Sequence, residues 1–178
     1  MIETKVYTLG AIGVIPSIVY WVLLVVLVVG VAFILFSQET RRLQKIAKLL
    51  LLEWCWVVFS SAVVFRETKP ENAIVLVPFS SYFCITENSY FLEAMVINIL
   101  NIIMFVPIGL LLRMSSHNWK GVVLVGGLIS VAIEVTQFVL RRGLCEIDDV
   151  IHNVLGCMVG YAIATLALTL TFKKNKSS

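Results

Sequence analysis

Long apolar segments separated by short polar ones make up most of the sequence. The hydrocarbon core of a bilayer is roughly 30 Å thick, and an α-helix of about 20 residues spans it. Five apolar segments reach or approach that length: Ala11–Phe36, Leu49–Phe65, Ala94–Leu112, Gly121–Leu140 and Val150–Phe172. We therefore expect an all-α integral membrane protein, built as a bundle of five transmembrane helices.

The polar segments divide the chain into four parts. We expect residues 1–66 to form two N-terminal transmembrane helices joined by a basic linker, and residues 91–172 to form a three-helix core. Residues 67–90 are the long connection between these parts, and residues 173–178 are a basic cytoplasmic tail. The connection is too apolar for a solvated loop, since Ala73–Phe79 reads AIVLVPF. We expect it to lie in the membrane interface or to fold back against the helices, because non-helical backbone at membrane depth must be buried in protein.

The basic residues predict the orientation of the bundle, because cytoplasmic loops carry an excess of lysine and arginine. If the N-terminus lies outside, the inner segments hold nine basic residues: Arg41, Arg42, Lys45, Lys48, Arg113, Lys120, Lys173, Lys174 and Lys176. The outer segments then hold five: Lys5, Arg66, Lys69, Arg141 and Arg142. This distribution favours an N-out/C-in topology. It places the long connection and the turn after the fourth span on the outside.

Composition agrees with a membrane protein and narrows the function. Hydrophobic residues make up 60% of the chain and the mean hydropathy is +0.97, whereas soluble domains are about 45–50% apolar. The net charge is only +3, and the basic residues lie in short loops, so no nucleic-acid partner is expected. The sequence lacks the motifs of serine hydrolases, zinc proteases and phosphate-binding loops. We therefore favour a protein that is not an enzyme, and we expect no cofactor.

The stretch Ser130–Gly160 concentrates polar and ionisable residues in apolar surroundings, where their burial is costly and needs a reason. On an ideal helix Glu134, Gln137 and Arg141 share one face, since positions i, i+3 and i+7 lie close together. A second stripe follows in the fifth span: Asp149, Asn153, Gly156 and Gly160. The two helices are joined by a short polar turn, so they should be antiparallel neighbours whose polar stripes meet near the outer mouth of the bundle.

Other residues extend this predicted cluster. The small side chains of Gly156 and Gly160 would let a neighbouring helix approach closely. In the third span, Asn98 and Asn101 are three residues apart and so lie on one face. In the turn, Arg141 or Arg142 would lie close to three carboxylates: Asp148, Asp149 and Glu134.

Three interpretations of the cluster stay open. The first is a structural hydrogen-bond network that fixes helix register. The second is a site for a polar ligand, such as a lipid-linked cell-wall precursor or its phosphates, with Arg141 and Arg142 as phosphate donors and Glu134 and Asp149 as candidate acid and base. A metal site is least favoured, because a single histidine, His152, and a loose acidic turn show no recognised ligand spacing.

Four motifs in the second half of the chain resemble those of the VanZ family. They are LVPF (Leu76–Phe79), NIIMFVPIGLLL (Asn101–Leu112), IExxQ (Ile133–Gln137) and DDxxxNxxGxxxGY (Asp148–Tyr161). The resemblance covers about residues 72–161 and leaves the first two spans unmatched. Two departures concern the turn: Arg142 stands four rather than three residues before Glu146, and Glu146 replaces an aspartate. The resemblance implies a multi-pass protein of the bacterial plasma membrane that is linked to glycopeptide resistance, chiefly to teicoplanin.

This resemblance leads to three hypotheses on function. The favoured one is a resistance factor that changes how a lipoglycopeptide engages the outer membrane face or a lipid-linked cell-wall precursor, with membrane lipid as its other partner. The alternative is a membrane enzyme that acts on a lipid-linked phosphate or wall precursor through Glu134 and Asp149. A transporter is the weakest of the three, because the sequence shows no inverted repeat.

The cysteines suggest one further test of the topology. Cys84 and Cys145 both fall on the expected outer side, while Cys55 and Cys157 lie within spans. An oxidising exterior permits a disulfide between the outer pair, and closing a loop of about 60 residues would contribute roughly 4 kcal/mol in the chain-entropy account. The alternative is two unrelated free thiols, since pairing cannot be deduced from sequence.

Overall fold

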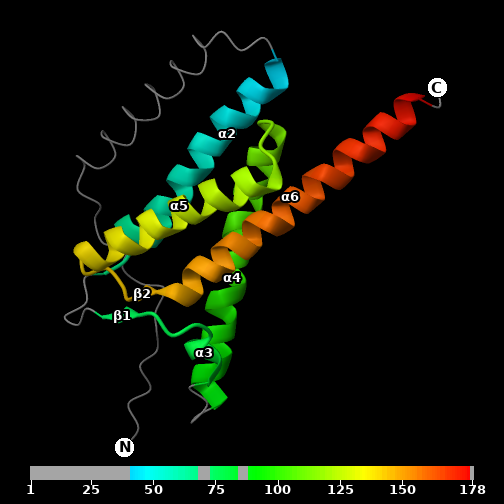
Figure 1. The fold of residues 1–178 in the computed structure, drawn as a ribbon. Coiled ribbons are helices and arrows are strands. Elements are labelled where there is room, and N and C mark those ends of the chain that lie inside the picture. The colour runs from blue at the N-terminus through cyan, green and yellow to red at the C-terminus, as the bar shows by residue number, and fades with distance from the viewer. Residues whose placement is uncertain (1–40, 68–72, 84–87, 177–178) are drawn as a thin grey trace, which may run out of the picture.

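Four helices that are long and apolar enough to cross a membrane dominate the structure, a computed structural model that describes residues 41–67, 73–83 and 88–176 (Figure 1). Their membrane-spanning parts are Arg42–Val64, Phe91–Met114, Trp119–Val139 and Ile147–Thr171. These correspond to the second to fifth predicted spans. The predicted first span, Ala11–Phe36, lies outside the described residues, so the count of five stays a prediction.

Each helix is longer than the apolar segment that predicted it. The first, α2, runs from Arg42 to Phe59 and continues as the π-helical turn η1, Ser60–Val64. The second and third, α4 (Asn88–Met114) and α5 (Trp119–Val139), are followed by α6, Ile147–Lys176. Hydropathy marks only the apolar part of a helix, while the ends depend on capping and on polar residues that favour helix. The basic linker therefore supplies the first turns of α2.

Local signals explain several of these ends. The Asn118 side chain caps α5 by accepting a hydrogen bond of 2.8 Å from the Gly121 N–H group. Two acidic residues, Asp148 and Asp149, occupy the first turn of α6, where the helix dipole favours negative charge. At the other end of α5, Arg141 has a φ of 53° and an exposed side chain, so the chain has already left the helix. The predicted helical face of Glu134, Gln137 and Arg141 is therefore wrong at Arg141.

The long connection folds back against the helices in its described part, residues 73–83. Strand β1, Ile74–Val75, pairs in parallel with strand β2, Cys145–Glu146, which precedes α6. A one-turn helix, α3 (Ser80–Phe83), follows and lies beside α4 (Figure 1). The bundle is thus helical apart from this short pair of strands, which joins segments about 70 positions apart in the sequence.

The closest packing in the bundle is between α4 and α6. A methyl group built on Gly156 would collide with the carbonyl oxygen of Ile102, and one built on Gly160 would collide with that of Val106. The reverse holds for Gly109 of α4, which faces the backbone of α6. Glycines on both helices therefore let the two backbones meet, as the small-residue spacing in α6 predicts.

Helix α5 shows how the chain separates core from membrane surface. One face is buried and holds Val122, Gly126, Ser130, Ile133, Glu134 and Gln137. The opposite face carries exposed aliphatic side chains at helical spacing: Leu124, Leu128, Val131 and Val135. An apolar outer face suits a hydrocarbon environment, and it leaves the polar residues of α5 pointing toward the other helices.

We expect Gly160→Ala to destabilise the protein. The added methyl group meets backbone rather than a side chain that can rotate away, and overpacking of this kind costs about 1–3 kcal/mol. Thermal unfolding of the purified protein in detergent would show a lowered midpoint.

Gly127→Ala is the matched control, because its methyl group would lie 3.7 Å from Val154 Cγ2, an ordinary contact. Alanine is also the better helix former by about 0.8–1 kcal/mol. Equal unfolding midpoints for the two variants would contradict close packing of α4 on α6.

Candidate functional site

A small polar cavity lies where the end of α2 meets α4, α5 and α6. Its volume is about 140 Å³. The polar residues that line it are Ser61, Arg66, Asn101, Glu134, Gln137, Asp149 and Asn153, and the apolar ones are Val58, Ala62, Met104, Phe105 and Ile133. Of these residues only Ser61 is exposed, so the cavity opens beside the last turn of α2.

Helix α5 contributes two polar side chains to the cavity wall. Glu134 is 3% exposed, and its Oε2 atom accepts a hydrogen bond of 3.0 Å from the backbone N–H group of Glu146 in β2. One turn later, Gln137 donates through Nε2 to the carbonyl oxygen of Ala62, at 2.9 Å. The strand pair therefore presents a backbone donor to the carboxylate, and the glutamine side chain joins α5 to the π-helical end of α2.

The other carboxylate comes from the first turn of α6. Asp149 is 9% exposed and accepts a hydrogen bond of 2.7 Å from the Asn101 side-chain amide of α4. Asn153, one turn further along α6, is 4% exposed and donates to the Ser130 hydroxyl of α5 at 2.8 Å. Residues four apart on a helix share a face, so Asp149 and Asn153 look into the same cavity.

Arg66 is the cation of this cavity, in the role that the sequence suggested for Arg141 or Arg142. It lies just past η1, and its guanidinium interacts electrostatically with both Glu134 and Asp149. Arg142 instead donates to the carbonyl oxygens of Val64, at 3.2 Å, and of Arg66. The expectation that Arg141 or Arg142 faces the carboxylates is therefore wrong: Arg141 is exposed, and Arg142 binds the backbone that follows α2.

Two buried acceptor atoms in the cavity wall have no hydrogen-bond partner among the described residues. They are Oε1 of Gln137 and Oδ1 of Asn153. The amide nitrogens of the same side chains, like that of Asn101, each donate one hydrogen bond, as described above. Buried polar atoms are almost always paired, so the cavity is suited to a guest that donates hydrogen bonds.

Asp148 and His152 belong to a second polar cluster, which fixes α3 to α6. The Asp148 carboxylate accepts from the Phe79 N–H group, and from the Ser80 hydroxyl at 3.5 Å. His152 Nδ1 lies 2.6 Å from the Asp148 carbonyl oxygen, so Nδ1 carries the proton there and Nε2 accepts from the Tyr82 hydroxyl at 2.7 Å. Neither residue lines the cavity, and their role is to hold the long connection in place.

The remaining predicted residues do not line the cavity. Asn98 is buried on α4 but does not line the cavity, while Gly156 and Gly160 form the contact with α4. Within the described residues, no group of three His, Cys, Asp or Glu side chains is placed to hold a metal ion. Cys145 is a free thiol in the structure, and its predicted partner, Cys84, lies outside the described residues.

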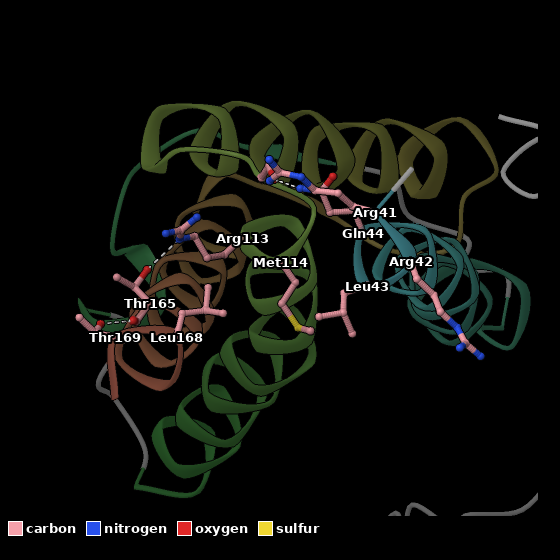
Figure 2. Close-up of a pocket in the computed structure, with 10 residues that line it drawn as sticks. Arg41, Arg42, Leu43, Gln44, Arg113, Met114, Thr165, Leu168 and Thr169 are labelled. Carbon is pink, nitrogen blue, oxygen red and sulfur yellow. Dashed lines mark hydrogen bonds between the residues drawn. The ribbon is translucent and has the colours of Figure 1, made fainter. Parts of the chain in front are cut away.

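A larger pocket of about 640 Å³ lies at the opposite end of the bundle (Figure 2). It is lined by residues from the start of α2, the end of α4 and the last third of α6: Arg41, Arg42, Leu43, Gln44, Arg113, Met114, Ser116, Thr165, Leu168 and Thr169. Arg113 donates to the Thr165 hydroxyl at 3.1 Å and lies 5.6 Å from the centre of the Tyr161 ring. Arg42 points away from the pocket (Figure 2). Its arginines do not converge on one point, and it contains no carboxylate.

Sequence reasoning missed Arg66, Ser130 and Tyr82 as contributors to the polar clusters. A signal existed for Arg66, since it stands directly after the second apolar span and must emerge at the same end of the bundle as the turn after the fourth. No such signal existed for Tyr82, whose place depends on how the long connection folds back.

The family of the chain follows from a comparison of its sequence with known families. A family model described as VanZ/LLP1 matches residues 19–168, which is more than half of the chain. The chain belongs to the VanZ/LLP1 family. Comparison with curated proteins and with solved structures found no match.

The VanZ/LLP1 match confirms the resemblance and extends it. It begins at residue 19, so the family region also includes the second predicted span and the part of the first span from residue 19 onward, which the motifs alone left unmatched. It includes every residue that lines the cavity. A VanZ-type protein with apolar helices of this length is a multi-pass membrane protein.

Cys145 gives a chemical test of the charge around the cavity. Burial raises the pKa of its thiol, and the neighbouring carboxylates of Glu134, Asp149 and Glu146 raise it further. The thiolate is the reactive form, so alkylation of Cys145 should be slow at neutral pH and should accelerate only above the usual pKa of a cysteine. Glu146→Gln should lower the thiol pKa and speed the reaction at a fixed pH.

The measurement is the rate of maleimide labelling against pH, in a variant that keeps Cys145 as its single cysteine. Glu93→Gln, an exposed glutamate on α4, is the control. A rate that is already maximal at neutral pH would contradict the raised pKa. In the wild-type chain, labelling of Cys145 only after reduction would instead show that it is paired with Cys84.

Proposed function

We propose that this protein lowers the susceptibility of a bacterial cell to lipoglycopeptides such as teicoplanin, by binding a membrane or cell-wall component at the outer face of the plasma membrane. In this proposal the chain has five transmembrane helices with the N-terminus outside and the C-terminus inside. The polar cavity between α2, α4, α5 and α6 is the binding site. Membrane lipid, a lipid-linked cell-wall precursor and the drug itself are the candidate partners.

The observation that carries this proposal is a cavity with two carboxylates inside an apolar bundle. Charged groups at membrane depth cost at least about 2.5–3.5 kcal/mol each on insertion scales, and they commonly mark functional sites. Glu134 and Asp149 come from different helices and face one cavity together with Arg66. A network that only fixed helix register would be expected to satisfy its own atoms, whereas Gln137 and Asn153 keep unpaired acceptors.

The position of the cavity supports the outer face. The end of α2, the end of α5 and the start of α6 meet there, and the excess of basic residues lies at the other ends of these helices. The positive-inside rule therefore favours a cavity that faces the outside. The long connection lies at the same end, through β1 and α3.

A membrane enzyme is the second candidate, favoured by the presence of two carboxylates in one cavity. Glu134 and Asp149 would serve as acid and base on a lipid-linked phosphate or wall precursor. Mass spectrometry of lipids from cells with and without the protein separates the two proposals. A new lipid product that disappears in Glu134→Gln would favour the enzyme, and an unchanged lipid profile favours the binding protein.

We expect Glu134→Gln and Asp149→Asn to lose most of the protection against teicoplanin. Hydrogen bonds to charged groups are worth about 1.5–3 kcal/mol, which corresponds to roughly a tenfold to a hundredfold loss of affinity. The measurement is the inhibitory concentration of teicoplanin for cells that express each variant, with the amount in the membrane checked by immunoblot. Glu93→Gln is the matched control and should protect as well as the wild type. Full protection by both cavity variants would refute a role for the cavity.

The topology is tested by labelling cysteines from outside the cell. In a background without native cysteines, Lys69→Cys should react with a membrane-impermeant maleimide in intact cells, and Lys120→Cys should react only after lysis. The reverse pattern would show that the bundle is inverted and that the cavity faces the cytoplasm.

A further inference from the structure

The chemistry of the cavity wall restricts what can occupy it. Three amide groups line the cavity, and each donates one of its two N–H groups: Asn101 to Asp149, Gln137 to Ala62 and Asn153 to Ser130. The Ser61 hydroxyl donates to the Val58 carbonyl oxygen at 2.9 Å. Arg66 and the second N–H of each amide remain as donors, but the two side-chain atoms of the wall without a partner in the described part of the chain are both acceptors, Oε1 of Gln137 and Oδ1 of Asn153.

The charges in the cavity further restrict which ligand it can bind. The cavity contains two carboxylates, Glu134 and Asp149, and one guanidinium, Arg66. When both carboxylates are ionised they exceed the cation by one charge. An anionic group such as phosphate would bind the Arg66 guanidinium, but it would be repelled by the two carboxylates and would leave the two amide oxygens unpaired. An ammonium group carries the opposite charge and three N–H donors.

The volume of the cavity limits the size of the group that can enter it. A volume of about 140 Å³ is the space of four or five waters at about 30 Å³ each. An aminoethyl group fits such a space, whereas a sugar ring with its substituents or a peptide does not. Only the amine end of a larger molecule would enter, beside the exposed Ser61 at the end of α2.

We propose that the cavity binds a primary ammonium group, held between Glu134 and Asp149 with Gln137 Oε1 and Asn153 Oδ1 as its neutral acceptors. This rests on the proposed function, since it names the ligand chemistry of the same site. The amine belongs either to the headgroup of an aminophospholipid or to a water-soluble molecule. Arg66 limits the affinity for simple cations, because it already neutralises part of the negative charge.

The test uses the full chain in phosphatidylcholine nanodiscs, in a buffer without primary amines. Ethylammonium chloride should raise the midpoint of thermal unfolding in a saturable way, because a ligand that binds only the folded state stabilises it. Sodium chloride and sodium phosphate should have no such effect. Tetramethylammonium chloride should also fail, because it carries the charge without N–H donors. A shift that is equal with sodium chloride, or that appears with phosphate alone, would overturn the proposal.

Variants check that the shift comes from this cavity. Glu134→Gln should weaken ethylammonium binding by at least about tenfold, since it removes a charge–charge contact worth 1.4 kcal/mol or more, while Glu93→Gln should bind as the wild type does. Asn153→Asp should tighten binding by adding a negative acceptor, and it keeps the proposal testable if Glu134→Gln does not fold. An unchanged affinity in the folded cavity variants would contradict this site.

A second arm identifies the source of the amine. If the ligand is a lipid headgroup, nanodiscs that contain phosphatidylethanolamine should raise the unfolding midpoint and abolish the further effect of ethylammonium. If it is a water-soluble amine, this lipid should have no effect and ethylammonium should act as before.

Failure of ethylammonium to bind, with loss of teicoplanin protection in Asp149→Asn, would overturn the ammonium site alone. Binding without any effect of the variants on protection would overturn the proposed function alone.

Discussion

The close contact between the backbones of α4 and α6 determines where the polar groups of this protein meet. Gly156 faces Ile102, the residue after Asn101, and so the first third of α6 lies against the middle of α4. This approach is what brings the Asn101 amide within 2.7 Å of Asp149. With larger residues in place of the glycines the helices would stand further apart, and this hydrogen bond could not form at the same time as helix packing. The cavity is therefore a product of the packing as much as of its polar residues.

The two carboxylates are placed in the bundle by different means. Asp149 lies in the first turn of a helix, where the dipole favours its charge, and it receives a side-chain donor from a neighbouring helix. Glu134 lies near the end of α5, and its donor is the backbone N–H group of Glu146 in β2, the residue directly before α6. That donor is held in place by the pairing of β2 with β1. The long connection, which looks peripheral, thus supports the geometry of the cavity.

Much of the fold could be predicted from hydropathy, because each helix that spans a membrane must carry its own apolar run. The inward orientation of Glu134, Gln137 and Asn153 could also be predicted, since a polar residue on a lipid-facing surface is costly. The position of the turn residues could not. Arg141 adopts a positive φ that ends α5, and Arg142 reaches the backbone that follows α2, so neither lies on the helical face assumed for it. The second apolar segment indicates at which end of the bundle Arg66 lies, but its partners Glu134 and Asp149 are far away in the sequence and no local pattern identifies them.

The π-helical end of α2 leaves carbonyl groups that α2 does not satisfy, and their partners are made much later. Gln137 binds the carbonyl oxygen of Ala62, and Arg142 binds that of Val64. A ribosome completes the second span well before it reaches these residues, so during synthesis the end of α2 stands in the membrane without its donors. The end of α2 gains these donors only when α5 has entered the membrane and the turn after α5 has formed. The end of α2 is thus completed only after α5 and the turn that follows it have been made, and a chain interrupted before α5 would leave this polar backbone in the membrane without its donors.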